Sequence, residues 1–471
     1  MSTLSASASK VGLARRFVRT LKERLAGELP NQVARSAALH FADAVGVGLA
    51  ASMSPSGGAW TRAASRWAQG GPASVFGQRA SASSANAAMI NGGLIHSLEF
   101  DDTHTGSIMH GSSVVAAAAL ACAESVGASG RAMLAAYARG YEALILLGLA
   151  APGRFHANGF QASSVAGTMA AALVAAELHH LDEDATVNAL GIALSQSAGV
   201  MEFLSNGSSV KSLNPGWAAH GGVIAASLAE MGMTGPETSL DGRWGLFAQF
   251  CDDSGAVERM SLLLESVGAP WRMPDAAFKL YPCCHYLHPF VEAASRLADA
   301  GLMPDAIAEI VCEVPLGASS VICEPWDHAL NPVTGHSARW SLPIVVSSRF
   351  VEGTVDLATF EAPASQAVRE LARRVRWVPL EGARFPERFE AAIHCRLIDG
   401  GVRSVRIDDV EGNPSRPASP ERISEKFRIN ASRVVEAETV GQLESVLLGL
   451  ADRDTPISAL SALLRATRMA A

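Results

Sequence analysis

The sequence has few aromatic and few charged residues for its length. Of its 471 residues, 6% are aromatic and 18% are charged, whereas 49% are hydrophobic. The formal net charge of −8 leaves no basic excess for nucleic acid, so we expect no nucleic-acid partner. No continuous apolar run reaches about 18 residues, so we expect no membrane partner either. The composition is typical of a soluble globular protein, and the length favours two domains.

The seven cysteines lack the regular spacing of a disulfide framework or of a zinc site. Cys283 and Cys284 are adjacent, which is poor geometry for a disulfide, and the scattered positions of the others leave an iron–sulfur cluster without enough ligands. We therefore expect free thiols in a reducing compartment, and the cytoplasm is the expected location. A Walker A motif and a dinucleotide-binding fingerprint are absent as well.

The N-terminal stretch MSTLSASASKVGLARRFVRTLKERL is basic and rich in serine, as transit peptides are. The spacing of its apolar residues favours the start of an ordinary amphipathic helix instead.

Helical periodicity dominates the chain from about residue 31 to residue 262. After a helix over QVARSAALHFADAVGVGLAAS, further helices are expected over 84–97, 113–126, 130–150, 163–180, 183–200 and 217–231. The pattern changes near 268–282: IAEIVCEVP alternates like a strand, and FEAAIHCRLIDGGVRSVRID predicts two strands joined by a turn. Helical periodicity returns from Ile423, where Ser419 is placed to cap the helix.

These segments predict a mainly α fold: a large all-helical domain built from both chain ends, with an inserted α+β lid domain. Residues 1–268 form the first part of the helical domain and residues 269–411 form the lid. Residues 412–471 are C-terminal helices that return to the helical domain.

One short segment, LEFDDTHTGSIMHGSSV, gathers acids and imidazoles just before an alanine-rich helix: Glu99, Asp101, Asp102, Thr103, His104 and His110. These residues could simply cap and charge the helix that follows. Asp101, His104 and His110 could instead bind a metal, although their spacing matches no common zinc pattern. In a third interpretation, His110 exchanges a proton and an aspartate of FDD orients its imidazole.

Two further segments contain lysines that could hold an anion. Lys211 lies in a Ser/Gly/Asn-rich loop with Ser208 and Ser209, just before a helix, although a lysine in such a loop is often only solvated. In FKLYPCCHYLHPF, Lys279 precedes Cys284, His285 and His288. The cysteines of such a segment are most often small buried residues, and either histidine could face a cleft at the domain boundary.

Weaker signals come from two more loops. GRFHANGFQASSVAG contains His156 and Gln161, and CEPWDHALNPVTGHSARWSLP contains Trp326, His328, His336 and Arg339.

Taken in order, the segments HSLEFDDTH…MHGSSV, GYE…GF…AG, K…NPGWAAHGG, KLYPCCHYLH and ARWSLP resemble the MmgE/PrpD family. This family includes 2-methylcitrate dehydratases, cis-aconitate decarboxylases and iminodisuccinate epimerases. The resemblance covers nearly the whole chain. It implies a homodimer, no metal or organic cofactor, a small di- or tricarboxylate substrate, and an active site between the helical domain and the lid.

The resemblance also assigns residues. His110 matches the histidine of the family's HPS motif, Thr103 and the acids of EFDD match DFDDT, and Lys211 matches the lysine of KxLHPG. Lys279 matches the lysine of the K-x-Y-P-C-C segment, and His288 matches a position usually filled by histidine.

The chain departs from the family pattern at several positions. Gln161 stands where many members have histidine, Asn214 replaces the histidine of LHPG, and Gly111 replaces the proline of HPS. Cys284 occupies a position that can be histidine in the decarboxylase-like members. In those members the histidine that corresponds to Gln161 lines the pocket. The change at Gln161 therefore argues against a cis-aconitate decarboxylase.

We expect a cofactor-independent lyase that moves a proton at a carbon next to a carboxylate. Lys211 with Ser208 and Ser209 would stabilise the carboxylate charge, and His110, oriented by Asp101 or Asp102, would move the proton. Dehydration of a 2-methylcitrate-like hydroxy acid ranks first, on family frequency. Alternatives are epimerisation of an amino- or imino-dicarboxylate, decarboxylation of cis-aconitate, and carboxylate binding without catalysis.

Overall fold

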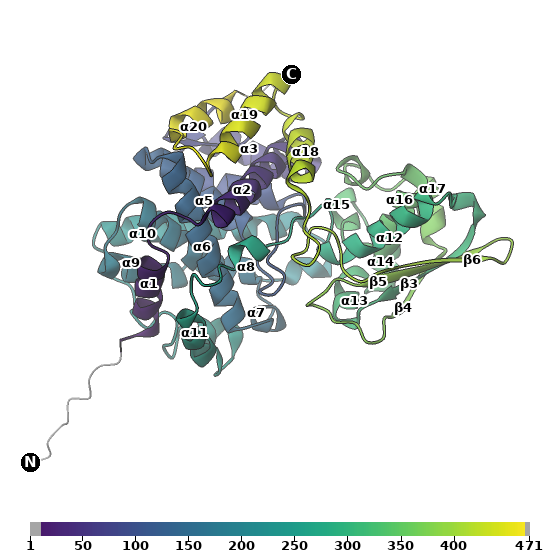
Figure 1. Cartoon of the computed structure of the whole chain (residues 1–471), viewed down its shortest axis with the longest axis horizontal. Helices are drawn as coiled ribbons and strands as arrows, with labels where there is room; N and C mark the ends of the chain where they lie inside the picture. Colours follow the sequence, from purple (N-terminus) through teal and green to yellow (C-terminus); the bar gives the residue numbers. More distant parts are fainter. Residues whose placement is uncertain (1–10, 467–471) are drawn as a thin grey trace, which may run out of the picture.

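Helices make up most of the first half of the chain and pack around one apolar centre (Figure 1). The structure is a computed structural model that describes residues 11–466. The helices of this half are α1 (Leu13–Arg24), α2 (Asn31–Ser52), α3 (Gly58–Trp67), α4 (Ser84–His96), α5 (Ser112–Val126), α6 (Gly130–Ala150), α7 (Arg154–Ala157), α8 (Ala162–Leu178), α9 (Glu183–Leu194), α10 (Leu213–Glu230) and α11 (Ala256–Glu265). A small hairpin, β1 (Ala73–Ser74) with β2 (Ser81–Ala82), interrupts this otherwise helical domain.

Helices α4 and α10 cross almost backbone to backbone. A Cβ added at Gly92 would lie 3.1 Å from Gly216 Cα, and one at Gly216 would lie 2.5 Å from the Met89 carbonyl oxygen. Because only glycine lacks a side chain, these positions allow an approach that other residues would prevent. The crossing brings the C-terminal end of α4 close to the start of α10.

The lid has its own apolar core beneath a four-stranded sheet. Strands β3 (Ile307–Val314), β4 (Val375–Pro379), β5 (Ala391–Leu397) and β6 (Val402–Ile407) lie in the order β4-β3-β5-β6. β3 is parallel to β4 and antiparallel to β5, which pairs antiparallel with β6. The lid helices are α12 (His288–Asp299), α13 (Leu316–Ile322), α14 (Trp326–Leu330), α15 (Gly335–Ala338), α16 (Leu342–Glu352) and α17 (Gln366–Ala372).

The last three helices, α18 (Pro420–Ala431), α19 (Ala437–Gly449) and α20 (Ile457–Arg465), return to the first domain (Figure 1). One buried apolar cluster unites residues 13–276 with Phe427 and later residues, and includes Leu357 of the lid. A second cluster contains residues 283–407. The mainly α fold with an inserted sheet region is thus confirmed.

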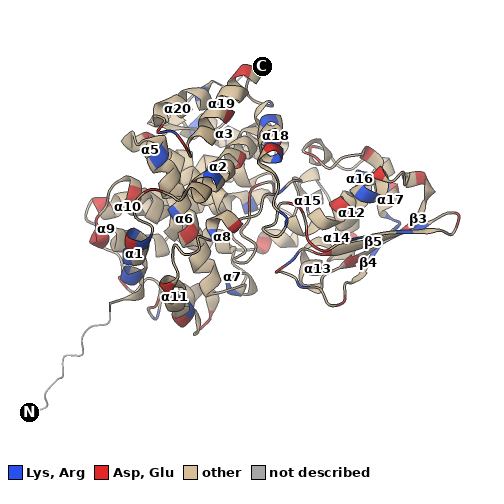
Figure 2. Ribbon diagram, viewed as in Figure 1, with Lys and Arg blue, Asp and Glu red and all other residues tan. Residues whose placement is uncertain are grey.

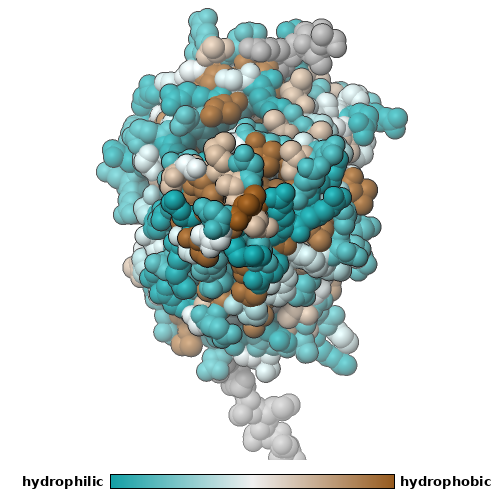
Figure 3. Space-filling view, turned by 90° about the vertical axis from the view of Figure 1, so that its right-hand side faces the viewer, coloured by the Kyte–Doolittle hydropathy of each residue, from teal (hydrophilic) through white to brown (hydrophobic). Residues whose placement is uncertain are grey.

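Charge and hydropathy follow this division. Charged residues are most frequent on peripheral helices such as α1 and α11 and on the lid, and long parts of the helical ribbon carry none (Figure 2). The lid end of the molecule is mostly hydrophilic, with small hydrophobic groups among the polar residues (Figure 3).

Several expected boundaries were wrong. The helix predicted over 183–200 ends at Leu194, and the helix predicted from 217 begins at Leu213, so that Asn-Pro-Gly lies in its first turn rather than in a preceding turn. Proline is tolerated there because the first helical N–H groups have no partner within the helix. Strand β4 was not predicted. Ser419 accepts a hydrogen bond from Arg422 N and caps α18 as expected.

Within residues 11–466, one helix, α6, is long and apolar enough to cross a membrane by length and composition, and 83% of its most apolar window is buried inside the protein. The bent pair Asn31–Ser52 and Pro55–Trp67 passes the same test only if both parts are counted as one span. Extensive burial is what the core helix of a globular domain shows.

Candidate functional site

The connection between α4 and α5, residues 97–111, places most of the candidate side chains. Two buried cations hold its backbone in place. Lys279 Nζ donates to the Glu99 carbonyl oxygen (3.2 Å), and Arg339 Nη1 donates to the carbonyl oxygens of Leu98 (2.6 Å) and Pro282 (2.5 Å). Glu99 itself adopts φ = +52°, a left-handed conformation that a non-glycine residue keeps only when its surroundings enforce it.

A carboxylate between two lysines forms the centre of the site. Glu99 Oε1 lies 2.5 Å from Lys211 Nζ, and Glu99 Oε2 lies 3.6 Å from Lys279 Nζ. Burial alone raises the pKa of Glu99, but Lys211 and Lys279 outweigh it and hold the pKa well below its usual range. The same attraction raises the pKa of Lys279 despite its burial. Glu99 and Lys279 are therefore charged near pH 7.

Lys211 is buried rather than solvated. It lies in a short 3₁₀ turn, Ser209–Ser212, and its ammonium is 5.1 Å from the ring centre of Trp340 and 5.8 Å from that of Phe203. Trp60 Nε1 donates to Ser212 Oγ (2.9 Å) and ties this turn to α3.

His110 lies beside this charged centre. Its Nδ1 is 2.9 Å from Thr103 Oγ1 and 3.1 Å from the Asp102 carbonyl oxygen, and its backbone N–H donates to Ser163 Oγ at the start of α8. Burial lowers the pKa of His110 to about 3; Asp101 opposes this effect, while Lys279 adds to it. His110 is therefore neutral near pH 7 and able to accept a proton.

The carboxylates of Asp101 and Asp102 are both hydrogen-bonded to groups other than His110. Asp101 Oδ2 lies 2.8 Å from Nδ1 of His96, the last residue of α4. Asp102 accepts hydrogen bonds from Ser112 N and Ser112 Oγ, and its carboxylate is 2.8 Å from Nδ1 of His40. The Asp102 side chain therefore fixes the start of α5 and leaves only its backbone carbonyl to His110.

Gln161 and Asn214 enter the site from α8 and α10. Asn214 Nδ2 donates to Gln161 Oε1 (2.7 Å), and Gln161 Nε2 lies 3.2 Å from His96 Nε2. The rings of His96 and His110 are 4.9 Å apart between centres. Two residues that depart from the family pattern thus form one hydrogen-bonded chain with a histidine that the sequence did not single out.

The lid contributes Cys284, His285 and His288, all buried. Burial raises the pKa of the Cys284 thiol to about 11, although Lys279 and Lys211 act in the opposite direction. Burial, reinforced by other cations and histidines, holds the pKa values of His285 and His288 well below their usual range. These groups are uncharged near pH 7, and the His285 ring packs edge-on against Phe389 (4.7 Å between centres).

Ser208 and Ser209 are not brought into this cluster. Ser209 is exposed and Ser208 is half-buried. Near them, a cavity of about 260 Å³ opens between the two domains, and its walls include Phe203 and Trp340, the rings that flank Lys211. This cavity offers a small molecule a route toward the lysine.

The structure also groups three possible metal ligands, His96, Asp101 and His110, whose ligand atoms lie within 4.8 Å of one another. His104, included in the metal hypothesis from the sequence, bonds to Ser107 Oγ instead. The carboxylate of Asp101 is engaged by His96, and the ammonium groups bound to Glu99 would repel a second cation. A metal-free site therefore stays our prediction.

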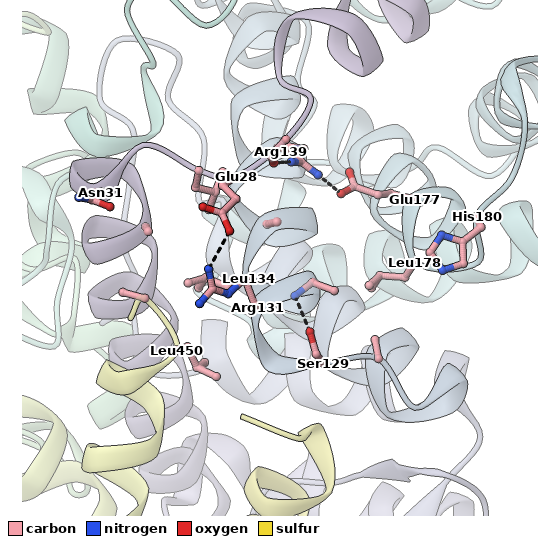
Figure 4. Close-up of a pocket in the computed structure, with 17 residues that line it drawn as sticks. Glu28, Asn31, Ser129, Arg131, Leu134, Arg139, Glu177, Leu178, His180 and Leu450 are labelled. Carbon is pink, nitrogen blue, oxygen red and sulfur yellow. Dashed lines mark hydrogen bonds and ion pairs between the residues drawn. The ribbon is translucent and has the colours of Figure 1, made fainter. Parts of the chain in front are cut away.

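A larger cavity, about 620 Å³, lies elsewhere, between α6, α8 and the chain before α2 (Figure 4). Its charged side chains pair with one another: Arg139 with Glu177 (2.5 Å) and Arg131 with Glu28 (3.1 Å). Each of these arginines has a carboxylate of its own, whereas Lys211 and Lys279 share the single carboxylate of Glu99. The Glu99 centre therefore keeps an excess of positive charge and is the better carboxylate site.

Sequence reasoning missed several residues of the site. His96 was present in the quoted HSLEFDDTH segment, three positions before Glu99 and five before Asp101, and this spacing near a helix end was a usable signal. Arg339 was noted only as a weak candidate. Lys426 had no local signal, yet its Nζ reaches from α18 to Asp43 (2.8 Å) and to the Phe100 carbonyl oxygen (2.8 Å).

Two family models match the chain, one after the other along its length. The family model described as the MmgE/PrpD N-terminal domain matches residues 15–258, and that of the MmgE/PrpD C-terminal domain matches residues 281–449. Cis-aconitate decarboxylase from Homo sapiens is 31% identical over 395 residues, covering 80% of this chain and 79% of the relative. Cis-aconitate decarboxylase from Aspergillus terreus is 28% identical over 405 residues, or 80% of each chain.

A third relative, the cis-aconitate decarboxylase-like protein oryM from Aspergillus oryzae, is 27% identical over 460 residues, covering 93% of this chain and 94% of its own. Since both family domains match in order and together span most of its length, the chain belongs to the MmgE/PrpD family.

Proposed function

We propose that the protein is a cofactor-independent lyase acting on a small tricarboxylate or dicarboxylate, and that decarboxylation of a cis-aconitate-like substrate is its leading reaction. The observation that carries this proposal is the buried Lys211–Glu99–Lys279 group beside a neutral His110. The names of the relatives, all cis-aconitate decarboxylases or like them, move this reaction ahead of the dehydration expected from the sequence.

The proposed reaction needs fixed positive charge and one proton. When the bond to the departing carboxylate breaks, CO₂ leaves and the electron pair remains on a carbon conjugated to another carboxylate. Lys211 and Lys279 stabilise that charge in a site of low polarity, where fixed cations act more strongly than in water. His110 delivers the proton, which it takes up once the negative substrate has raised its proton affinity.

Dehydration of a 2-methylcitrate-like hydroxy acid is the second candidate. It is favoured by Gln161, an amide standing where many family members have histidine. Dehydration also begins beside a carboxylate, but it must protonate a leaving hydroxyl, for which the Thr103–His110 hydrogen bond (2.9 Å) offers a donor.

The test is incubation of the purified protein in D₂O with cis-aconitate, 2-methylcitrate and an amino-dicarboxylate, followed by proton NMR. Loss of CO₂ with deuterium in the product supports decarboxylation, and formation of an alkene from the hydroxy acid supports dehydration. Exchange with inversion at the α-carbon would indicate an epimerase instead. Binding without exchange would indicate a carboxylate-binding protein and contradict the proposal.

Two controls sharpen the test. His110→Ala should abolish turnover with the fold retained, and near-normal turnover would remove the catalytic assignment. Activity that chelators abolish would contradict the metal-free chemistry. The homodimer and the cytoplasmic location remain predictions, and sedimentation of the intact chain checks the first.

A further inference from the structure

Four buried side chains from three separate parts of the chain form a continuous hydrogen-bonded series: Asn214, Gln161, His96 and Asp101. The distances are 2.7 Å from Asn214 to Gln161, 3.2 Å from Gln161 to His96 and 2.8 Å from His96 to Asp101. Each of the four residues is at most 8% exposed. Because water does not compete at such positions, every donor in the series must face an acceptor.

One backbone carbonyl determines which groups in the series donate hydrogen bonds and which accept them. Asn214 Nδ2 lies 3.4 Å from the Val200 carbonyl oxygen, which can only accept, so this amide nitrogen is correctly placed as a donor. Its second N–H then donates to Gln161 Oε1. The Gln161 Nε2 group is left to donate to His96 Nε2.

His96 can satisfy both neighbours in only one form. Its Nε2 must present a lone pair to the Gln161 amide, and its Nδ1 must carry a proton for the Asp101 carboxylate. An imidazolium would direct an N–H at Nε2 against the N–H of Gln161 and leave two buried donors facing each other.

We infer that Asn214, Gln161 and Asp101 lock His96 as a neutral imidazole with its proton on Nδ1, so that His110 alone of the two neighbouring imidazoles exchanges a proton. The second half of this inference rests on the proposed function, whereas the first half does not. His96 is on this account a positioning residue, and Gln161 determines its protonation state.

A neutral His96 matters because of what surrounds His110. The two rings are 4.9 Å apart, so a charged His96 would repel the proton that His110 must accept. Three charged or titratable groups near His96 belong to the connection between α4 and α5: Glu99, whose Oε1 is 3.9 Å from His96 Nε2, Asp101 and His110. Three others come from elsewhere in the chain: Lys211, Lys279 and His336.

The lock can be tested without any substrate. In protein labelled with ¹⁵N-histidine, the ring ¹⁵N shifts report which nitrogen carries a proton. We expect the His96 signal to stay in the neutral Nδ1–H form from pH 5.5 to 8.5. In Gln161→Met, which keeps the size but removes the donor, Nε2 should become protonated within this range.

Gln366→Met, the same substitution on the exposed surface of the lid, is the matched control and should leave the His96 signal unchanged. Loss of the signal in His96→Gln assigns it. If that variant does not fold, the signal that shifts in both Gln161→Met and Asp101→Asn identifies His96. A wild-type His96 protonated on Nε2, or titrating between these pH values, would overturn the inference.

The claim that only His110 exchanges a proton is tested with whichever substrate of the panel is turned over. Wild-type kcat should follow one imidazole ionisation, whereas Gln161→Met should show a second ionisation and a roughly tenfold lower kcat near pH 6, with KM changed less than threefold. An unchanged pH profile in Gln161→Met would overturn this claim. The NMR result stands whether or not the panel yields turnover, so the two failures are distinguishable.

Discussion

At the scale of single residues, the site depends on charges that compensate one another away from water. Glu99 is 2% exposed, and its carboxylate contacts two lysines that are also buried. Buried ion pairs contribute little net stability, but removal of one partner leaves an uncompensated charge and is costly. The proposed function and the stability of the fold therefore depend on the same three residues, Glu99, Lys211 and Lys279.

We predict that Lys211→Met lowers the free energy of unfolding by about 3 kcal/mol and abolishes turnover, because Glu99 keeps only its longer contact with Lys279. Urea unfolding and the NMR assay measure the two effects. Lys22→Met, at an exposed lysine, is the control and should change neither.

The double variant Glu99→Gln/Lys211→Met separates charge from catalysis. It should recover only part of the lost stability, because the carboxylate charge is gone but buried Lys279 loses its counterion as well, and it should not recover turnover. Equal stability of the single and double variants would contradict the proposed coupling.

A second residue-scale prediction concerns Gly111, where the family pattern has proline. A Cβ at this position would lie 2.0 Å from the Tyr141 ring, so the ring fills the space that a larger residue would need. Gly111→Ala should therefore cost about 1–3 kcal/mol through overpacking. Gly441→Ala, in α19 with nothing near the added atom, should be neutral or slightly stabilising in the same thermal unfolding measurement.

The sequence was informative about these residues to different degrees. Glu99, His110, Lys211 and Lys279 stood out because polar residues are rare in an alanine-rich chain and gather in a few short segments. The partner of each aspartate could not be predicted, because Asp101 reaches back to the end of α4 and Asp102 reaches forward to Ser112. Such choices depend on the path of the backbone, which the order of residues alone does not determine.

At the scale of elements, the periodicity predicted the helices well because their apolar faces recur at helical spacing. Boundaries failed where other forces decide them. Helix α9 ends at Leu194 although the residues after it are compatible with a helix, and Ser197 Oγ there bonds to the Val165 carbonyl oxygen of α8. Strand β4 was missed because its five residues, Val375–Pro379, are too short to show an alternating pattern.

The crossing of α4 and α10 gives an element-scale prediction. Gly216 lies five residues after Lys211, and its close contact with α4 sets the spacing between α4, which precedes Glu99, and the start of α10, which follows Lys211. Gly216→Ala should separate the helices, lower the free energy of unfolding by about 2 kcal/mol and reduce turnover more than tenfold. A variant that is destabilised but fully active would contradict the link between this crossing and the site, and Gly441→Ala again serves as the control.

At the scale of the whole molecule, buried cations from distant segments converge on the connection between α4 and α5. Arg339 reaches it from the lid and Lys426 from the C-terminal helices. The Arg339 guanidinium is 0% exposed and joins Leu98 of the helical domain to Pro282 at the start of the lid. The site therefore forms only when all three parts of the chain are in place.

We predict that Arg339→Met raises KM and lowers kcat together, because the lid segment that carries Lys279 and Pro282 loses the bridge through Arg339 to the Leu98 carbonyl oxygen. Arg339→Lys should be almost as impaired in kcat and KM as Arg339→Met, since a single ammonium cannot reproduce the planar arrangement of guanidinium donors. Steady-state kinetics measure the effect, and Arg373→Met, at an exposed arginine of the lid, is the control. Wild-type kinetics in Arg339→Met would contradict the prediction.

Buried and half-buried histidines throughout the molecule make its stability depend on pH. Burial is the largest cause that lowers the pKa values of His104, His156 and His336, each to about 4, and it acts in the same direction on His285 and His288. Below about pH 6.5 these histidines bind protons in the unfolded chain but stay neutral in the folded protein. Their contribution to stability is therefore complete above that pH and is lost as the pH falls. Each of these histidines should lower the free energy of unfolding by an amount on the order of 1–2 kcal/mol when the pH falls from 7 to 5. Urea unfolding at pH 7, 6 and 5 should therefore show a steep decline in the free energy of unfolding, and the decline should be shallower in His104→Gln. A free energy of unfolding that is constant or rises on acidification would show that these imidazoles are not held neutral by the fold.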